Sequence, residues 1–248
     1  MAAPDSSSPA SPTQDSTGLI APGWHTAVLL GFLVGISAFE TWNMANSPSV
    51  EFTSRARIAS YLIGIGWEWA MVGFIAWGVR RCGRRLSDLI AGSWPDPAAF
   101  LRDLGIGVLF QIASGIVLGT LRIALRDTTS KSVRSLLPDS PTEMAIWILL
   151  SVTAGFCEET IFRGYLQKQF TRLTGSAAVG IVLQALIFGA CHGYQGIKPI
   201  LVIGVYGGLF GVLAHYVKNL RPGMLAHFLQ DSIAGLAGRA LLKHLPSG

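Results

Sequence analysis

The chain has 248 residues, of which 50% are hydrophobic and only 13% are charged. A soluble domain has about 25% charged residues, so this composition argues against a soluble protein and predicts an all-α, polytopic membrane protein. The formal net charge is +5, but the basic residues form short clusters beside apolar segments, as membrane anchors do. We therefore expect membrane lipid, and no nucleic acid, as a partner.

Residues 1–20 are rich in Ser and Pro and contain no Lys or Arg. They lack the basic region that begins a secretory signal, so we expect a disordered tail at 1–20 and a transmembrane domain at 21–248. About 20 apolar residues cross a bilayer. A bundle of about seven to eight transmembrane helices is predicted, with an eighth arising from a broken C-terminal segment or from 86–101. The seven candidate segments are 24–44, 58–79, 104–125, 142–167, 176–194, 199–217 and 222–242.

The densest basic cluster is RRCGRR at 80–85. The positive-inside rule places such a loop in the cytoplasm, and the N-terminus with it. The Lys and Arg residues as a whole divide evenly between the two sides, so this orientation depends on the concentration of charge in one loop. The sequence thus predicts a multi-pass integral membrane protein with a cytoplasmic N-terminus.

Glycine-rich and acidic positions inside the apolar segments give further expectations. The stretch GVYGGLFG at 204–211 predicts a helix that approaches a neighbour closely. Glu40 and Glu68 are interpreted as neutral side chains hydrogen-bonded between helices, with cavity lining as the alternative. A proton-coupled transporter that uses Glu40, Glu68 and Glu158 as a relay is a third hypothesis. No internal repeat is apparent, which disfavours it.

The segment 142–167 contains EETIFR at 158–163. An ionisable residue at the centre of a membrane helix costs about 2.5–3.5 kcal/mol, so it needs a partner or a polar cavity. Glu159 and Arg163 are four residues apart, which suits an ion pair on one helical face. Glu158 lies about 100° around the helix and has no cation at i+3 or i+4. We therefore expect Glu159 to hold Arg163 and Glu158 to be free to accept a proton.

Two later segments each add a polar group. FGACH at 188–192 carries His192, and HFLQD at 227–231 carries His227 and Asp231 four residues apart. A carboxylate at that spacing can fix the tautomer and orientation of an imidazole. Two histidines, a free glutamate and an arginine that converge on one water and one carbonyl would suit hydrolysis.

The three blocks EETIFR, FGACH and HFLQD, in this order on apolar segments, resemble the pattern EExxxR, FxxxH and Hxxx[N/D] of the CPBP intramembrane proteases. That family contains the type II CAAX prenyl endopeptidases and the bacterial Abi proteins. The resemblance covers about 140–235, and earlier residues match only as membrane helices. It implies an intramembrane endopeptidase that cuts a membrane-associated peptide or a lipidated protein, prenylated proteins being one candidate class.

The resemblance implies that Glu158 is the general base and that His192 positions the water. The family is often labelled metalloprotease, and Glu158, His192 and His227 are candidates for the three protein ligands of a catalytic zinc. However, the sequence has no HExxH motif, and a ligating Glu158 would leave no obvious general base. The cofactor question stays open between no metal and zinc.

The remaining roles also follow from the resemblance. It implies that His227 and Asp231 stabilise the developing oxyanion and that Glu159 and Arg163 brace the site. The family commonly has Asn at the position of Asp231. An ionised Asp cannot donate to an oxyanion, so this role rests more safely on His227.

The competing hypothesis is a non-enzymatic membrane protein, such as an immunity or scaffold protein, that keeps the polar cluster for helix packing. Three intact blocks on three segments favour the enzyme. The substrate, the host and the oligomeric state are not predicted by the sequence.

Overall fold

The computed structural model describes residues 18–46, 53–127 and 131–244. This part of the chain is helical and contains no strand, which confirms the all-α prediction. The elements are α1 (Gly23–Asn46), α2 (Ser54–Arg81), α3 (Leu86–Ile90), α4 (Pro97–Leu125), α5 (Lys131–Leu136), α6 (Pro141–Glu158), a π-helical segment (Glu159–Leu166), α7 (Gln167–Thr174), α8 (Ala177–Ala190), a 3-10 turn (Gly193–Gln195), α9 (Ile197–Val217) and α10 (Arg221–His244).

Side-chain caps fix where several of these helices begin. Asp96 accepts a hydrogen bond from the backbone N–H of Ala99 at 2.7 Å, and Pro97 follows as the first residue of α4. Ser140 and Pro141 begin α6 in the same way. A polar cap followed by proline is a strong start signal, because the cap satisfies a free N–H and proline already has a helical φ.

Within the part of the chain that the structure describes, five helical stretches are long and apolar enough to cross a membrane, so the chain is a polytopic membrane protein. They are Gly23–Met44, Ser54–Arg81, Pro97–Leu125, Pro141–Thr174 and Ile197–Val217, and they match five of the seven expected segments.

The other two expected segments, 176–194 and 222–242, are helical but differ from the expectation. α8 has only 14 residues because the chain leaves the helix at Cys191 and turns at Gly196, where φ is +111°. α10 is a continuous helix, but polar residues such as His227 and Asp231 break its apolar sequence, and it is not among the five.

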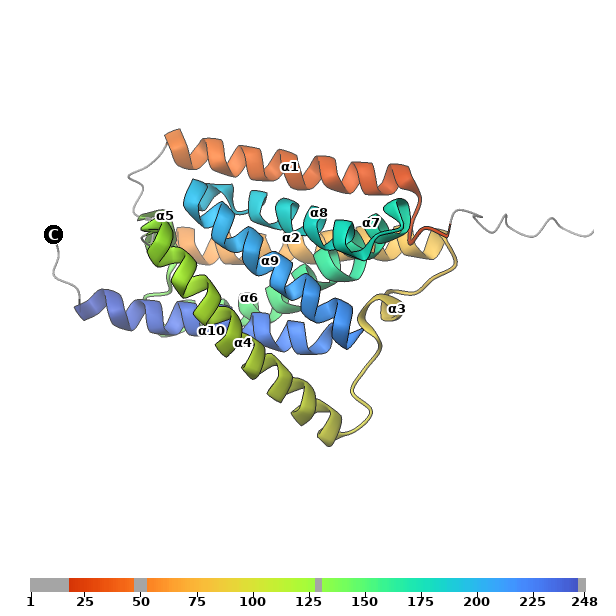
Figure 1. The fold of residues 1–248 in the computed structure, drawn as a ribbon. Coiled ribbons are helices and arrows are strands. Elements are labelled where there is room, and N and C mark those ends of the chain that lie inside the picture. The colour runs from red at the N-terminus through yellow and green to blue at the C-terminus, as the bar shows by residue number, and fades with distance from the viewer. Residues whose placement is uncertain (1–17, 47–52, 128–130, 245–248) are drawn as a thin grey trace, which may run out of the picture.

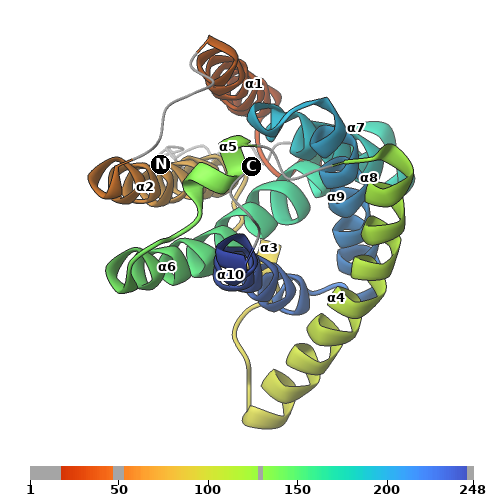
Figure 2. The same cartoon turned by 90° about the vertical axis from the view of Figure 1, so that its left-hand side faces the viewer.

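α6 is central to the bundle, with α2 on one side and α10 on the other. α8 packs along α9, and α4 crosses α9 and α10 obliquely (Figures 1 and 2). The predicted close approach at 204–211 is confirmed. A Cβ added to Gly189 of α8 would lie 2.9 Å from the Cα of Gly204 on α9, and one added to Gly207 would lie 2.9 Å from Phe188. Small residues therefore bring these two backbones together.

The expected tail at 1–20 lies mostly outside the described residues, which begin at residue 18. Its last residue is packed against the bundle. Ile20 is buried, and its backbone N–H donates to the side-chain oxygen of Gln169 at 2.8 Å. Residue 20, which the sequence placed in the tail, thus contacts the helical bundle.

Candidate active site

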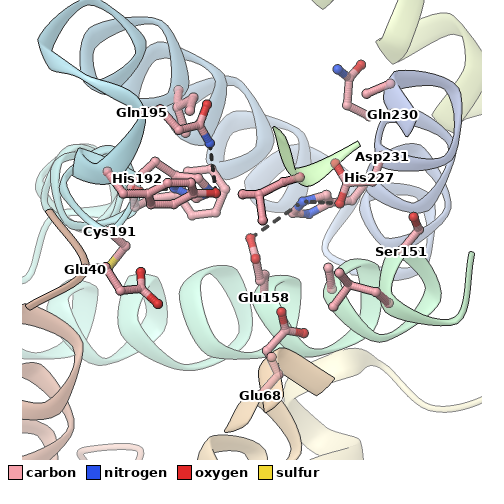
Figure 3. Close-up of a pocket in the computed structure, with 18 of the residues that line it drawn as sticks. Glu40, Glu68, Ser151, Glu158, Cys191, His192, Gln195, His227, Gln230 and Asp231 are labelled. Carbon is pink, nitrogen blue, oxygen red and sulfur yellow. Dashed lines mark hydrogen bonds and ion pairs between the residues drawn. The ribbon is translucent and has the colours of Figure 1, made fainter. Parts of the chain in front are cut away.

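A cavity of about 1900 Å³ opens among α1, α2, α4, α6, α8, α9 and α10. Its wall includes Glu158, His192, His227 and Asp231, which come from three different helical regions (Figure 3). Glu40 of α1 and Glu68 of α2 line it as well. Residues separated by many positions in the sequence therefore share one polar space inside an apolar bundle.

The segment with the two glutamates changes from α-helix to π-helix at the site. Glu158 is the last residue of α6, and the π-helical segment begins at Glu159. Single π-helical turns occur frequently at functional sites. The sequence interpretation assumed regular α geometry here, so the helix type is a difference from the expectation, although the i to i+4 pairing survives it.

The expected ion pair between Glu159 and Arg163 is present and fully buried, with Nη1 of Arg163 2.8 Å from Oε1 of Glu159. The other terminal nitrogen of Arg163 donates to the carbonyl of Gly207 at 3.2 Å. Its guanidinium carbon also lies 4.3 Å from the ring centroid of Phe188 and 4.8 Å from that of Phe210. Aromatic faces attract a desolvated cation, so the arginine is held by charge, hydrogen bonding and stacking together.

His227 lies at the centre of the charged groups. Its Nδ1–H donates to Oε1 of Glu159 at 3.1 Å, because a carboxylate oxygen can only accept. Its Nε2 is 3.6 Å from Oε2 of Glu158 and 3.6 Å from Oδ2 of Asp231. The predicted His227–Asp231 pair is therefore brought together, and Glu158 joins it. The bond between His227 and Glu159 was missed by sequence reasoning, since local spacing carries no information about contacts between separate helices.

His192 occupies another part of the same cavity. Its Nδ1–H donates to the carbonyl of Phe188 at 2.9 Å, which leaves a lone pair on Nε2 when the ring is neutral. Figure 3 shows His192 on the opposite side of Glu158 from His227. The two imidazoles thus flank the glutamate, with His192 on the α8 side and His227 on the α10 side.

The alternative of a zinc site does not fit the described residues. Within them, no group of three or more His, Cys, Asp or Glu side chains is arranged to hold a metal ion. Glu158 and His227 approach each other, but His192 does not complete the three-ligand set that a catalytic zinc requires. No step of the chemistry is therefore derived through a metal.

Glu68 differs from its predicted role. Its Oε2 is buried and has no hydrogen-bond partner among the described residues, so the expected bond between helices is not made at this atom. The alternative role in lining the cavity is the one that the structure supports for both Glu68 and Glu40. The sequence signal for Glu68 was its acidic side chain inside an apolar segment.

The fold and the cavity define a class of protein: a polytopic helical membrane protein with carboxylates and imidazoles gathered in a cavity inside the bundle. Residues 140–233 match the family model described as Type II CAAX prenyl endopeptidase Rce1-like. This match, over the segment that contains Glu158 through Asp231, supports membership in the CAAX protease family, and that family suggests a peptidase. No curated protein matches the chain, and no solved structure matches it.

Proposed function

We propose that this protein is an intramembrane endopeptidase that hydrolyses a peptide bond in a membrane-associated substrate by means of a water activated by Glu158. One observation carries the proposal. Of the two adjacent glutamates, Glu159 is occupied by Arg163 and His227, whereas Oε2 of Glu158 is buried in the cavity without a hydrogen-bond partner. The nearest cationic group to this oxygen is Nε2 of His227 at 3.6 Å. A carboxylate oxygen that accepts no hydrogen bond is available as a general base.

The geometry supports a division of roles. Glu158 takes a proton from water as the oxygen attacks the substrate carbonyl, and it returns that proton to the leaving amine. His192 offers the unprotonated Nε2 as an acceptor that orients the water. The Nε2–H of protonated His227 donates to the developing oxyanion, while Glu159 and Asp231 stabilise the charge on the ring. In this mechanism every proton is exchanged between water, Glu158 and substrate.

The substrate class follows from where the site lies. The cavity wall is formed largely by the apolar helices, and it includes apolar side chains such as Leu33, Ile36 and Met71 beside the polar ones. Such a wall suits a peptide, or a protein carrying a lipid chain, that reaches the site from the membrane. Prenylated proteins are one candidate class, in keeping with the family of residues 140–233.

The experiment is a proteomic comparison of membrane-protein C-termini and released peptides from cells with the wild-type protein and with Glu158→Gln. Gln is nearly isosteric but cannot act as a base. We expect cleavage to fall about 10²- to 10⁴-fold, which is the usual contribution of a general base. Glu40→Gln, a change in a carboxyl on another part of the cavity wall, is the matched control and leaves cleavage unchanged. Unchanged cleavage by Glu158→Gln would rule out the glutamate-base mechanism.

A further inference from the structure

Glu68 of α2 has a buried carboxyl oxygen, Oε2, that faces the candidate active site without a hydrogen-bond partner. Buried polar atoms in folded proteins are almost always satisfied, and an exception calls for an explanation. Glu158 has the same feature, since its Oε2 is also buried and accepts no hydrogen bond from the described residues. Figure 3 shows the two carboxyls as neighbours in the cavity, reaching it from α2 and α6. Two orphan acceptors therefore lie in one small region.

Two ionised carboxylates cannot satisfy each other, because both only accept hydrogen bonds. A protonated carboxyl has an O–H group and can donate one. A single proton on one of the pair would supply the missing donor, either directly or through one water. A buried charge next to a like charge is expensive, and pairs of carboxyls in such sites commonly share a proton.

The surrounding charges indicate which group holds that proton. The charged groups that act on Glu68 are Glu158 on α6 and His227 and Asp231 on α10. The charge of Glu159 is already balanced by Arg163. One imidazolium thus faces two carboxylates before Glu68 is counted, and an ionised Glu68 would add an unmatched negative charge inside the bundle. Among the described residues no cation forms an ion pair with Glu68, whereas Glu158 lies 3.6 Å from Nε2 of His227.

We propose that Glu68 is a positioning residue for the hydrolysis proposed above: its protonated carboxyl donates a hydrogen bond to Glu158, directly or through one water, and holds that carboxylate turned toward the attacking water. Glu68 keeps its proton throughout. Glu158 remains the group that accepts the proton of water and returns it to the leaving amine. The inference rests on the proposed function of Glu158 and adds a residue outside the segment 140–233.

Kinetics of paired variants test the donor role. Glu68→Gln keeps a donor of nearly the same shape, so kcat stays close to the wild-type value. Glu68→Leu removes the donor, and kcat falls about 10- to 100-fold with KM and Tm unchanged, the range expected for a hydrogen bond to a charged group. His215→Leu, at an exposed residue near the end of α9 that does not line the cavity, is the control and retains kcat. Full activity of Glu68→Leu, or equal impairment by Gln and Leu, would overturn the proposal.

Infrared spectroscopy of the purified full-length protein tests the same proposal without any substrate. The wild-type spectrum at neutral pH contains the carbonyl stretching band of a protonated carboxyl, and Glu68→Gln removes this band. Glu158→Gln shifts the band, because the acceptor of the hydrogen bond has changed. Absence of the band overturns the role of Glu68 even if Glu68→Leu does not fold. A wild-type protein that shows the band and cuts no peptide would instead overturn the proposed function.

Discussion

Glu159 and His227 are joined by a hydrogen bond of 3.1 Å between Oε1 of the carboxylate and Nδ1 of the imidazole. The same oxygen lies 2.8 Å from Nη1 of Arg163. One buried carboxylate therefore fixes a guanidinium of its own helical segment and an imidazole of α10. This arrangement directs Nε2 of His227 toward Glu158, so the stability of the junction between α6 and α10 and the geometry around the candidate base depend on the same residue.

Replacing Glu159 tests this double role. Glu159→Ala leaves the fully buried Arg163 without its ion pair, and we expect a loss of about 3–5 kcal/mol in the free energy of unfolding. Thermal unfolding in detergent measures the effect as a lower Tm. Glu158→Gln is the comparison. Glu158 pairs with no arginine and lies 3.6 Å from Nε2 of His227, so its replacement leaves Tm unchanged. Equal Tm values for the wild-type protein and Glu159→Ala would show that the pair does not stabilise the fold.

Removal of His227 tests the proposed oxyanion donor. His227→Ala takes away the Nε2–H beside Glu158, and we expect kcat to fall about 10²- to 10³-fold, as when an oxyanion-hole donor is lost. The measurement is cleavage of a membrane-associated peptide by the purified variant, with KM determined separately.

His215→Ala is the control for this prediction. His215 is an exposed histidine near the end of α9, so its replacement leaves kcat unchanged. A His227→Ala variant with wild-type kcat would remove His227 from the mechanism and leave it a structural partner of Glu159.

The parts of the site that depend on local spacing could be predicted from the sequence. The Glu159–Arg163 ion pair and the proximity of His227 to Asp231 both follow from residues four apart on a helix. The hydrogen bond between Glu159 and His227 joins residues 68 positions apart, and only the packing of α6 against α10 creates it. A pattern within one segment carries no information about such a contact.

The helix ends and the role of Glu68 show a second limit of sequence reasoning. Hydropathy suggested a span at 176–194, but the turn at Gly196 and the 3-10 segment before it shorten α8 to Ala177–Ala190. An acidic residue inside an apolar segment predicts that Glu68 needs a polar environment. The sequence does not distinguish a partner side chain from a cavity, because either one supplies the polar environment that an acidic residue needs.

A metal chelator tests the question that the sequence left open. The described residues bring Glu158 and His227 together without a third ligand, so we expect cleavage by the purified protein to be unchanged after treatment with 1,10-phenanthroline. Metal analysis of the same preparation accompanies the assay. Activity that is lost with the chelator and restored by added zinc would contradict this prediction and return Glu158, His192 and His227 to consideration as ligands.

Close packing between α6 and α10 gives a test of how precisely the site is held. A Cβ added to Gly155 would lie 2.7 Å from the carbonyl oxygen of Met224 and 3.0 Å from the backbone nitrogen of Phe228. Gly155→Ala must therefore move α10 away from α6, at a cost of about 1–3 kcal/mol for overpacking. His227 lies on α10 between these two contacts, so the shift separates it from Glu158. A displacement of about 1 Å can reduce the rate about 100-fold, and we expect kcat to fall by more than the loss of stability explains. Gly73→Ala on α2 is the matched control, because a Cβ there meets no atom within 4 Å. Ala is a better helix former than Gly, so the change leaves kcat at the wild-type value and does not lower Tm. If Gly155→Ala lowers Tm but leaves kcat intact, then the position of α10 does not control the chemistry, and His227 acts on the stability of the bundle alone.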